Sequence, residues 1–124
     1  MQAELAAAHC GQLPAEMLPR IVLAQRLRDA TMADVLLRSS PRGTVAILGQ
    51  GHARRDIGVP IYVAQRAPDV RVLAIGLVEV DAARTAPADY PETRVKDPIF
   101  DLVWFTRRQA RVDPCEKMPP VPSK

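Results

Sequence analysis

Aromatic residues and long apolar runs are scarce in this sequence. Only 4% of its 124 residues are Phe, Trp or Tyr, which is too few for the stacking platforms that bind single-stranded nucleic acids. No apolar run approaches the roughly 20 residues that a transmembrane helix needs, so no membrane span is expected. Cysteine occurs only as Cys10 and Cys115. These two residues are either unrelated small side chains or one disulfide, which would require an oxidising compartment.

A strong charge of either sign is also missing. The 17 basic and 14 acidic residues give a formal net charge of +3, and the basic residues are spread along the chain. This pattern argues against a nucleic-acid partner. The N-terminal stretch MQAELAAAHC has no basic region and too short an apolar segment for a signal peptide. It therefore predicts a short helix and no export signal.

The length of the chain suits one small domain. Hydrophobic residues make up 48% and charged residues 25% of the sequence, as in ordinary globular proteins. We assign residues 1–118 to this domain and expect residues 119–124, the end of a proline-rich segment, to form a disordered tail.

Helices and strands of an α/β fold are predicted in alternation. Residues 14–39 have the composition of one long helix, apolar on most sides and therefore expected to be buried on most sides. The β-branched run 44–48, a short helix over 61–67 and the run 70–80 predict a parallel βαβ unit. Residues 100–105 predict a third strand. It follows a proline-rich loop rather than a helix, so we expect it to be antiparallel to the second.

Two helices are too few for this partial sheet of about three strands. Strands that are apolar on both faces need a helix layer on each face. A bare face costs roughly 25 cal/mol for each Å² of apolar surface left in water. We therefore expect the chain to be part of a larger domain or to pair with another chain, for example as a homo-oligomer.

The loop GQGHARRDIGVP, residues 49–60, follows the first predicted strand. In α/β sheets, ligands bind at the ends of strands where such loops lie. The glycines allow sharp turns, the arginines suit carboxylate or phosphate, and the histidine can hydrogen-bond, bind a metal or carry a proton. The loop thus predicts a site for an anionic small molecule. Its predicted ligand-binding residues are Gly49, Gly51, His52, Arg54 and Arg55.

A plainer interpretation of this loop stays open. It could be a solvated turn in which Asp56 caps the following helix and pairs with an arginine. Two further polar residues, Gln25 and Asp29, lie one helical turn apart and share a face. They either line a cavity beneath the His52 loop, or Asp29 merely orients a neighbouring arginine.

Several separated motifs resemble those of the ChaN family, haem-binding proteins of iron uptake in the Tiki superfamily. They keep the order and spacing of that family over about residues 9–116. The resemblance covers only the C-terminal half of the family's domain, so it implies a missing N-terminal half that begins with a Gly-Glu-x-His segment. The motifs that carry it are HCGQLP, AQRLRDATMADVL, GQGHARRDIGVP, VLAIGLVEV, FDLVWFT and DPC.

The resemblance implies haem as the ligand. Arg54 and Arg55 would then hold the two propionates, and His52 would hydrogen-bond them or approach the iron. Tyr62, just behind the loop, is either a haem ligand or a core residue. Because the family includes lipoproteins, the resemblance also implies a location at the cell envelope, on its periplasmic side.

The wider superfamily offers an alternative function. Some relatives are proposed metal-dependent hydrolases, in which a Gly-x-x-His such as Gly49–His52 would pair with the glutamate and histidine of the missing half. A catalytic zinc usually needs three protein ligands. We therefore expect no metal site and no enzymatic activity from this chain alone.

Overall fold

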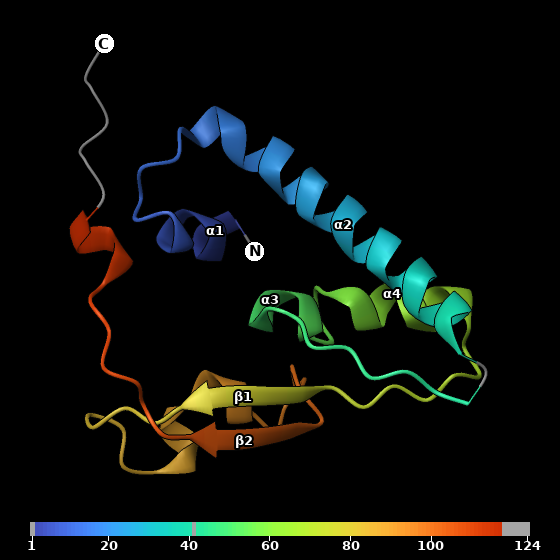
Figure 1. Cartoon of the computed structure of the whole chain (residues 1–124). Coiled ribbons are helices and arrows are strands. Elements are labelled where there is room, and N and C mark those ends of the chain that lie inside the picture. Colours follow the sequence, from blue (N-terminus) through green and yellow to red (C-terminus); the bar gives the residue numbers. More distant parts are fainter. Residues whose placement is uncertain (1, 41, 118–124) are drawn as a thin grey trace. The chain divides into compact units, whose positions relative to one another are not determined.

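The computed structural model describes residues 2–40 and 42–117 (Figure 1). Its contacts divide the chain into two compact units. The described residues of the first are 2–27 and 110–117, and those of the second lie within 28–109. The tail expected over 119–124 falls outside the described residues. Among the described helices, none combines the length and apolar character of a membrane span.

The first unit is built around the N-terminal helix α1 (Gln2–Ala8), which agrees with the predicted short helix. Cys10 and Gly11 end it in the left-handed conformation, with φ of 59° and 69°. The backbone N–H of Gly11 donates to the carbonyl of Ala6 and that of Cys10 to the carbonyl of Ala7, which caps the helix. This sharp turn sets the direction of the Cys10 side chain.

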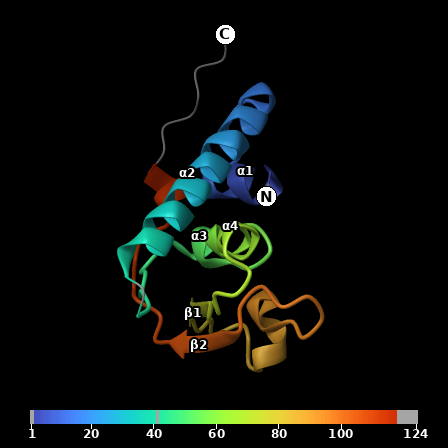
Figure 2. The same cartoon turned by 90° about the vertical axis from the view of Figure 1, so that its right-hand side faces the viewer.

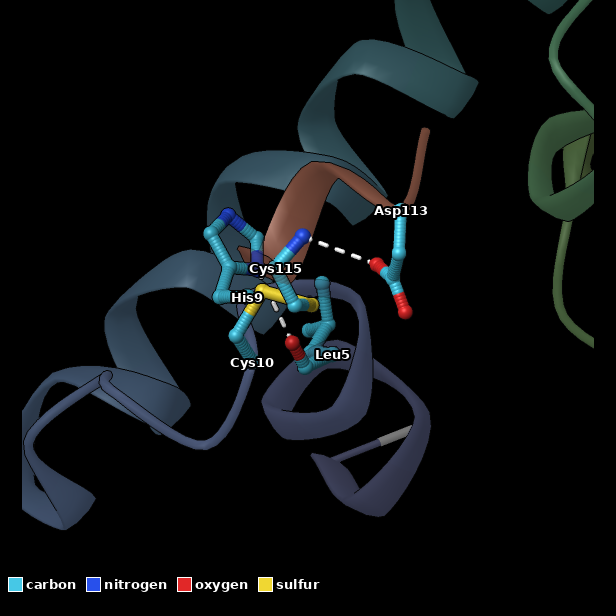
Figure 3. Close-up of a disulfide and its surroundings, with 5 residues drawn as sticks. All are labelled: Leu5, His9, Cys10, Asp113 and Cys115. Atoms are coloured by element: carbon cyan, nitrogen blue, oxygen red, sulfur yellow. Dashed lines mark hydrogen bonds between the residues drawn. A yellow bond between two sulfur atoms is a disulfide. The ribbon is translucent and has the colours of Figure 1, made fainter. Parts of the chain in front are cut away.

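A disulfide joins Cys10 to Cys115, with the two Cα atoms 5.5 Å apart. Figure 3 shows how it links the turn after α1 to the 3-10 helix η4 (Pro114–Lys117). The carboxylate of Asp113 accepts a hydrogen bond from the backbone N–H of Cys115 at 2.8 Å. His9 lies beside the bridge, with its Nδ1 2.8 Å from the carbonyl oxygen of Leu5. The disulfide therefore holds together segments from opposite ends of the sequence.

The long helix α2 (Leu18–Ser39) follows a 3-10 turn, η1 (Ala15–Met17), so the predicted helix over 14–39 is confirmed in its main part. The expectation that it is buried on most sides is wrong for the described structure. Only Asp29 and Ala33, one turn apart, are buried. The apolar residues of its other faces have too few described neighbours to cover them.

The second unit contains a small core between α2 and helix α4 (Val59–Arg66), which begins two residues before its predicted start. Ala33 of α2 packs there against Val59 and Val63. The Arg66 guanidinium donates to the carbonyl of Ala30 and lies 3.1 Å from the carboxylate of Asp34. Apolar packing and an ion pair thus fix α4 against the C-terminal part of α2, as both views show (Figures 1 and 2).

The sheet consists of β1 (Ile75–Glu79) and β2 (Leu102–Thr106), which run parallel. The expectation of an antiparallel third strand is therefore wrong. The connection over 80–101 contains only 3-10 turns, η2 (Pro87–Asp89) and η3 (Pro91–Thr93). Its length nevertheless exceeds the dozen or so residues that a parallel crossover requires. An α-helix in the connection is usual but not necessary.

The predicted first strand, residues 44–48, does not join the sheet. It is extended but pairs with no described strand, and the side chains of Val45 and Ile47 are 92% and 96% exposed. Leu48 alone packs, at the edge of the Ala33 cluster. The sheet therefore has two strands instead of about three, because β-propensity cannot replace a neighbouring strand. The predicted βαβ unit is not formed.

Candidate functional site

His52 lies in a single helical turn, α3 (Gln50–Ala53), that directly follows the extended segment 44–48 (Figure 1). The sequence predicted only an irregular loop here. Gly49 is the N-cap of this turn, and its carbonyl accepts from the backbone N–H of His52 at 2.9 Å. The His52 side chain is 25% exposed. One side of its ring is thus held by the protein and the other remains accessible.

The partner of His52 is Asp29, which comes from α2 and is only 3% exposed. The Nδ1 atom of His52 lies 2.5 Å from Oδ1 of Asp29. A buried carboxylate is costly unless it is hydrogen-bonded, and an ionised one can only accept. The Nδ1 atom of His52 is therefore the donor of this hydrogen bond, which leaves Nε2 as the ring nitrogen that could bind a ligand. Within the described residues no hydrogen bond reaches Nε2.

This pair has an arrangement that many metal-bound histidines share. Metal-bound histidines commonly donate their other N–H to a carboxylate, which fixes the ring and raises its basicity. The sequence singled out both residues, but as a loop histidine and as a carboxylate that lines a cavity or orients an arginine. In the structure, Asp29 holds His52 itself.

Arg54 faces a different carboxylate. Its Nε and Nη2 atoms donate to the two oxygens of Asp56 at 2.8 and 2.6 Å, and Arg94 reaches the same carboxylate at 3.3 Å. The hydrogen bonds from Arg54 are the main reason why the pKa of Asp56 lies below its usual 3.8. The predicted pairing of Asp56 with an arginine is confirmed. The predicted capping is wrong, because Gly58 is the N-cap of α4 and no side chain caps it.

This lowered pKa predicts a pH-dependent stability. A depressed folded-state pKa stabilises the protein above the unfolded value of 3.8, and the contribution is lost as the pH falls through the folded value. Replacing Asp56 by Asn should cost about 0.5 kcal/mol at pH 7, and the deficit should shrink below pH 4. Urea unfolding at pH 7 and pH 3 measures it. Asp69→Asn, at an exposed loop carboxylate, is the control. An equal Asp56→Asn deficit at both pH values contradicts the prediction.

Arg55 is paired with Asp101, whose carboxylate accepts from Nη1 of the arginine. The other carboxylate oxygen of Asp101 accepts from the backbone N–H of Ala74 at 2.7 Å. The backbone N–H of Arg55 donates to the carbonyl of Ile99 at 2.9 Å. Asp101, which the sequence did not single out, thus fastens the loop to the residue before β1. Because Asp101 lies 46 residues from Arg55 in the sequence, no local pattern indicated that the two would pair.

A depression of about 450 Å³ lies beside Arg55. Neither His52 nor Arg54 lines it. The structure therefore does not gather the three basic side chains around one cavity: each has its own carboxylate, on a different element. The residues that line the depression are Arg55, Pro60, Ile61, Ala64, Gln65, Val70 and Val72.

The remaining predicted site residues are two glycines, a tyrosine and a glutamine. A Cβ atom added at Gly51 would meet nothing within 4 Å, and one at Gly49 only a ring carbon of His52 at 3.8 Å, so neither position demands glycine sterically. Tyr62 is half-buried at the edge of the Ala33 cluster. Gln25 belongs to the first compact unit. In the described part of the chain, no group of three metal-ligating side chains is close enough to hold an ion.

No curated protein and no solved structure matches this chain. A family model described as haem-binding uptake, Tiki superfamily, ChaN matches residues 1–63, which is half of the chain. The matched region includes Cys10, Asp29 and His52 and ends within α4. The chain therefore belongs to the ChaN family of the Tiki superfamily, the family of haem-binding uptake proteins.

Proposed function

We propose that this protein binds haem as a cargo of uptake and that Nε2 of His52 is the ligand of its iron. The observation that carries the proposal is the buried Asp29–His52 pair. It supplies an imidazole with a fixed ring and an accessible nitrogen, which is what a haem-binding histidine requires. The family membership identifies haem as the ligand to test.

Arg54 and Arg55 would bind the two propionates of haem by exchanging their present carboxylate partners for them, since neither guanidinium is a free cation. Each guanidinium already binds a carboxylate, which is the chemical group that a propionate would present. Arg55 is the better candidate, because 47% of its side chain is exposed beside the depression. We assign one propionate to Arg55, where it would compete with Asp101. Arg54 would contribute more weakly to propionate binding. Bound haem would supply an iron centre with open coordination positions.

We also propose that the protein works on the periplasmic side of the cell envelope. Disulfides persist in oxidising compartments, and the Cys10–Cys115 bridge therefore favours the periplasmic side of the cell envelope over the cytosol. Uptake of haem from outside the cell would take place there. Partner proteins of this transport would meet the protein in the same compartment.

A hemin titration tests the haem site. The wild type should give a Soret band that saturates at micromolar hemin. His52→Ala should weaken binding at least tenfold, Asp29→Asn should weaken it about tenfold, and added imidazole should restore the spectrum of His52→Ala. His9→Ala is the matched control, because His9 is the chain's other histidine and lies in the first compact unit. No spectral change at tens of micromolar hemin, or equal binding by His52→Ala, contradicts the proposal.

The same oriented histidine supports a second candidate function. His52 would be one ligand of a metal-dependent hydrolase site to which residues outside the given sequence would contribute the further ligands. One histidine alone falls short of the three ligands that a catalytic zinc usually needs. Metal analysis and esterase or peptidase assays on a relative with both halves separate this function from haem binding. A stoichiometric metal with hydrolysis, and no Soret band with hemin, favours it.

A further inference from the structure

The depression beside Arg55 has two apolar walls. One wall is formed by residues of α4, among them Ile61 and Ala64. The other is formed by Val70 and Val72, which precede β1 and remain 47% and 37% exposed. The backbone N–H of Val70 donates to the carbonyl of Ala67 at 3.0 Å, so the chain turns after α4 and passes back beside it. The depression lies within the second compact unit, and its volume of about 450 Å³ is in the range of small-molecule sites.

The wall on α4 is a second apolar face of this helix. Val59 and Val63, four residues apart, are buried against Ala33. At about 100° of rotation per residue, Ile61 and Ala64 lie on the opposite side of the helix. A helix at the surface of a globular protein usually has one apolar stripe and one polar face. The second apolar face of α4 therefore indicates a contact beyond the core.

Two polar side chains, Arg55 and Gln65, line the depression together with these apolar residues. The Arg55 side chain is 47% exposed, and its Nη1 atom binds Asp101. Among the described residues, no other side chain bonds to this guanidinium. A guanidinium has five N–H donors, so it can bind a second carboxylate while Asp101 stays in place. The depression thus combines apolar walls with a cationic donor, which is complementary to a carboxylate that carries an apolar chain.

We propose that this depression binds a small monocarboxylate with an apolar chain, such as a medium-chain fatty acid. The carboxylate accepts hydrogen bonds from the Arg55 guanidinium, and the chain lies between α4 and the valines that precede β1. A short carboxylate would leave the apolar walls in water, and a neutral alcohol would leave the arginine donors unused. Arg55 is shared with the propionate contact proposed above, but His52 does not line the depression, so this site does not depend on haem binding.

A titration with octanoate tests the proposal, with the oxidised full chain at neutral pH and amide chemical shifts as the readout. Binding should saturate with a Kd below about 1 mM. Acetate lacks the apolar chain and 1-octanol lacks the carboxylate, so each should bind at least tenfold more weakly than octanoate. The shifts should centre on residues 60–65 and 70–72, which include the two walls of the depression.

Two substitutions of Ala64 separate charge from shape. Ala64 is exposed on a helix, so Ala64→Glu and Ala64→Gln should both leave the fold intact. Ala64→Glu places a second carboxylate in the depression and should weaken octanoate binding at least tenfold. Ala64→Gln adds a neutral side chain of the same size and should weaken it about threefold. Arg55→Gln should weaken it at least tenfold, whereas His52→Ala should stay within twofold of the wild type.

Four outcomes overturn the proposal. The first is a wild type that shows no saturation at about 10 mM octanoate, and the second is 1-octanol that binds as tightly as octanoate. The third is an equal loss of affinity in Ala64→Glu and Ala64→Gln. The fourth is a set of chemical shift changes confined to other parts of the chain, or abolished by His52→Ala, which would place octanoate at another site.

Discussion

Breaking the Cys10–Cys115 disulfide should lower the free energy of unfolding by about 4 kcal/mol. The bridge closes a loop across 105 residues of sequence, nearly the whole chain. In the chain-entropy treatment, stabilisation grows with the length of the closed loop, and this loop is close to the largest that a small domain can have. Domains of this size are stable by only about 5–15 kcal/mol in total.

The small core of this protein makes the disulfide more important. Among the described residues only eight apolar ones are buried, and six of them form two small clusters around Ala33 and Phe100. Small domains with limited cores commonly depend on cross-links for stability. Loss of the bridge should therefore leave much of the population unfolded at 37 °C.

Urea unfolding with and without a reducing agent measures this effect. The wild type should unfold at clearly lower urea when reduced, and a Cys10→Ser/Cys115→Ser variant should match the reduced wild type. The variant is also the control, because the reductant should no longer change its transition. Equal urea midpoints for oxidised and reduced wild type contradict the prediction.

The bridge and the Asp29–His52 pair belong to different compact units. At low temperature and without denaturant, reduction should therefore loosen α1 and η4 (Figure 3) while the histidine keeps its carboxylate. Hemin affinity should change less than twofold under these conditions. A parallel loss of haem binding on reduction would show that the two units are coupled.

The helices α1, α2 and α4 were predictable because their signals are local, whereas the single turn α3 was not predicted. Proline at the start of α4, the absence of breakers in α2 and the alanine-rich N-terminus each act within a few residues. The sheet was not predictable, because a strand forms only when another strand pairs with it. Residues 44–48 have the composition of a strand but pair with none of the described segments. The direction of β2 likewise depended on the path of a long loop.

The sequence singled out candidate site residues by their type but could not give their contacts. The types of His52 and Arg55 marked them as chemically active, and both lie where the sequence suggested, at the end of an extended segment. Their partners come from 23 and 46 residues away, Asp29 on α2 and Asp101 before β2. Of these three pairs, only that of Arg54 with Asp56 could be predicted from the local sequence, because the two residues are two positions apart.

Gly58 is the position in this loop that steric contact restricts to glycine, and Gly58→Ala should cost about 3 kcal/mol. A Cβ atom there would lie 2.3 Å from the carbonyl oxygen of His52 and 2.8 Å from that of Arg54. Both contacts are with backbone, so no side-chain rotation relieves them. The backbone N–H of Gly58 also donates to the carbonyl of Arg54 at 3.0 Å, which keeps the two ends of this turn close together.

The matched control is Gly51→Ala, a change of the same size seven residues earlier. Its Cβ would meet nothing within 4 Å, and alanine favours the helical turn by about 0.5–1 kcal/mol. Urea unfolding should therefore separate the two variants by more than 3 kcal/mol, with Gly51→Ala at or above the wild type. Equal stabilities would mean that the loop absorbs the added atom without cost.

The Gly58 variant also tests whether haem binding depends on the position of His52. The backbone carbonyl that the new methyl group displaces belongs to His52 itself. A shift of the His52 backbone that relieves the clash would lengthen the 2.5 Å contact between His52 and Asp29. Under conditions where the variant is still folded, hemin binding should fall about tenfold, as for Asp29→Asn. If Gly58→Ala loses stability but binds hemin like the wild type, the imidazole is not held by Asp29 when it meets the iron.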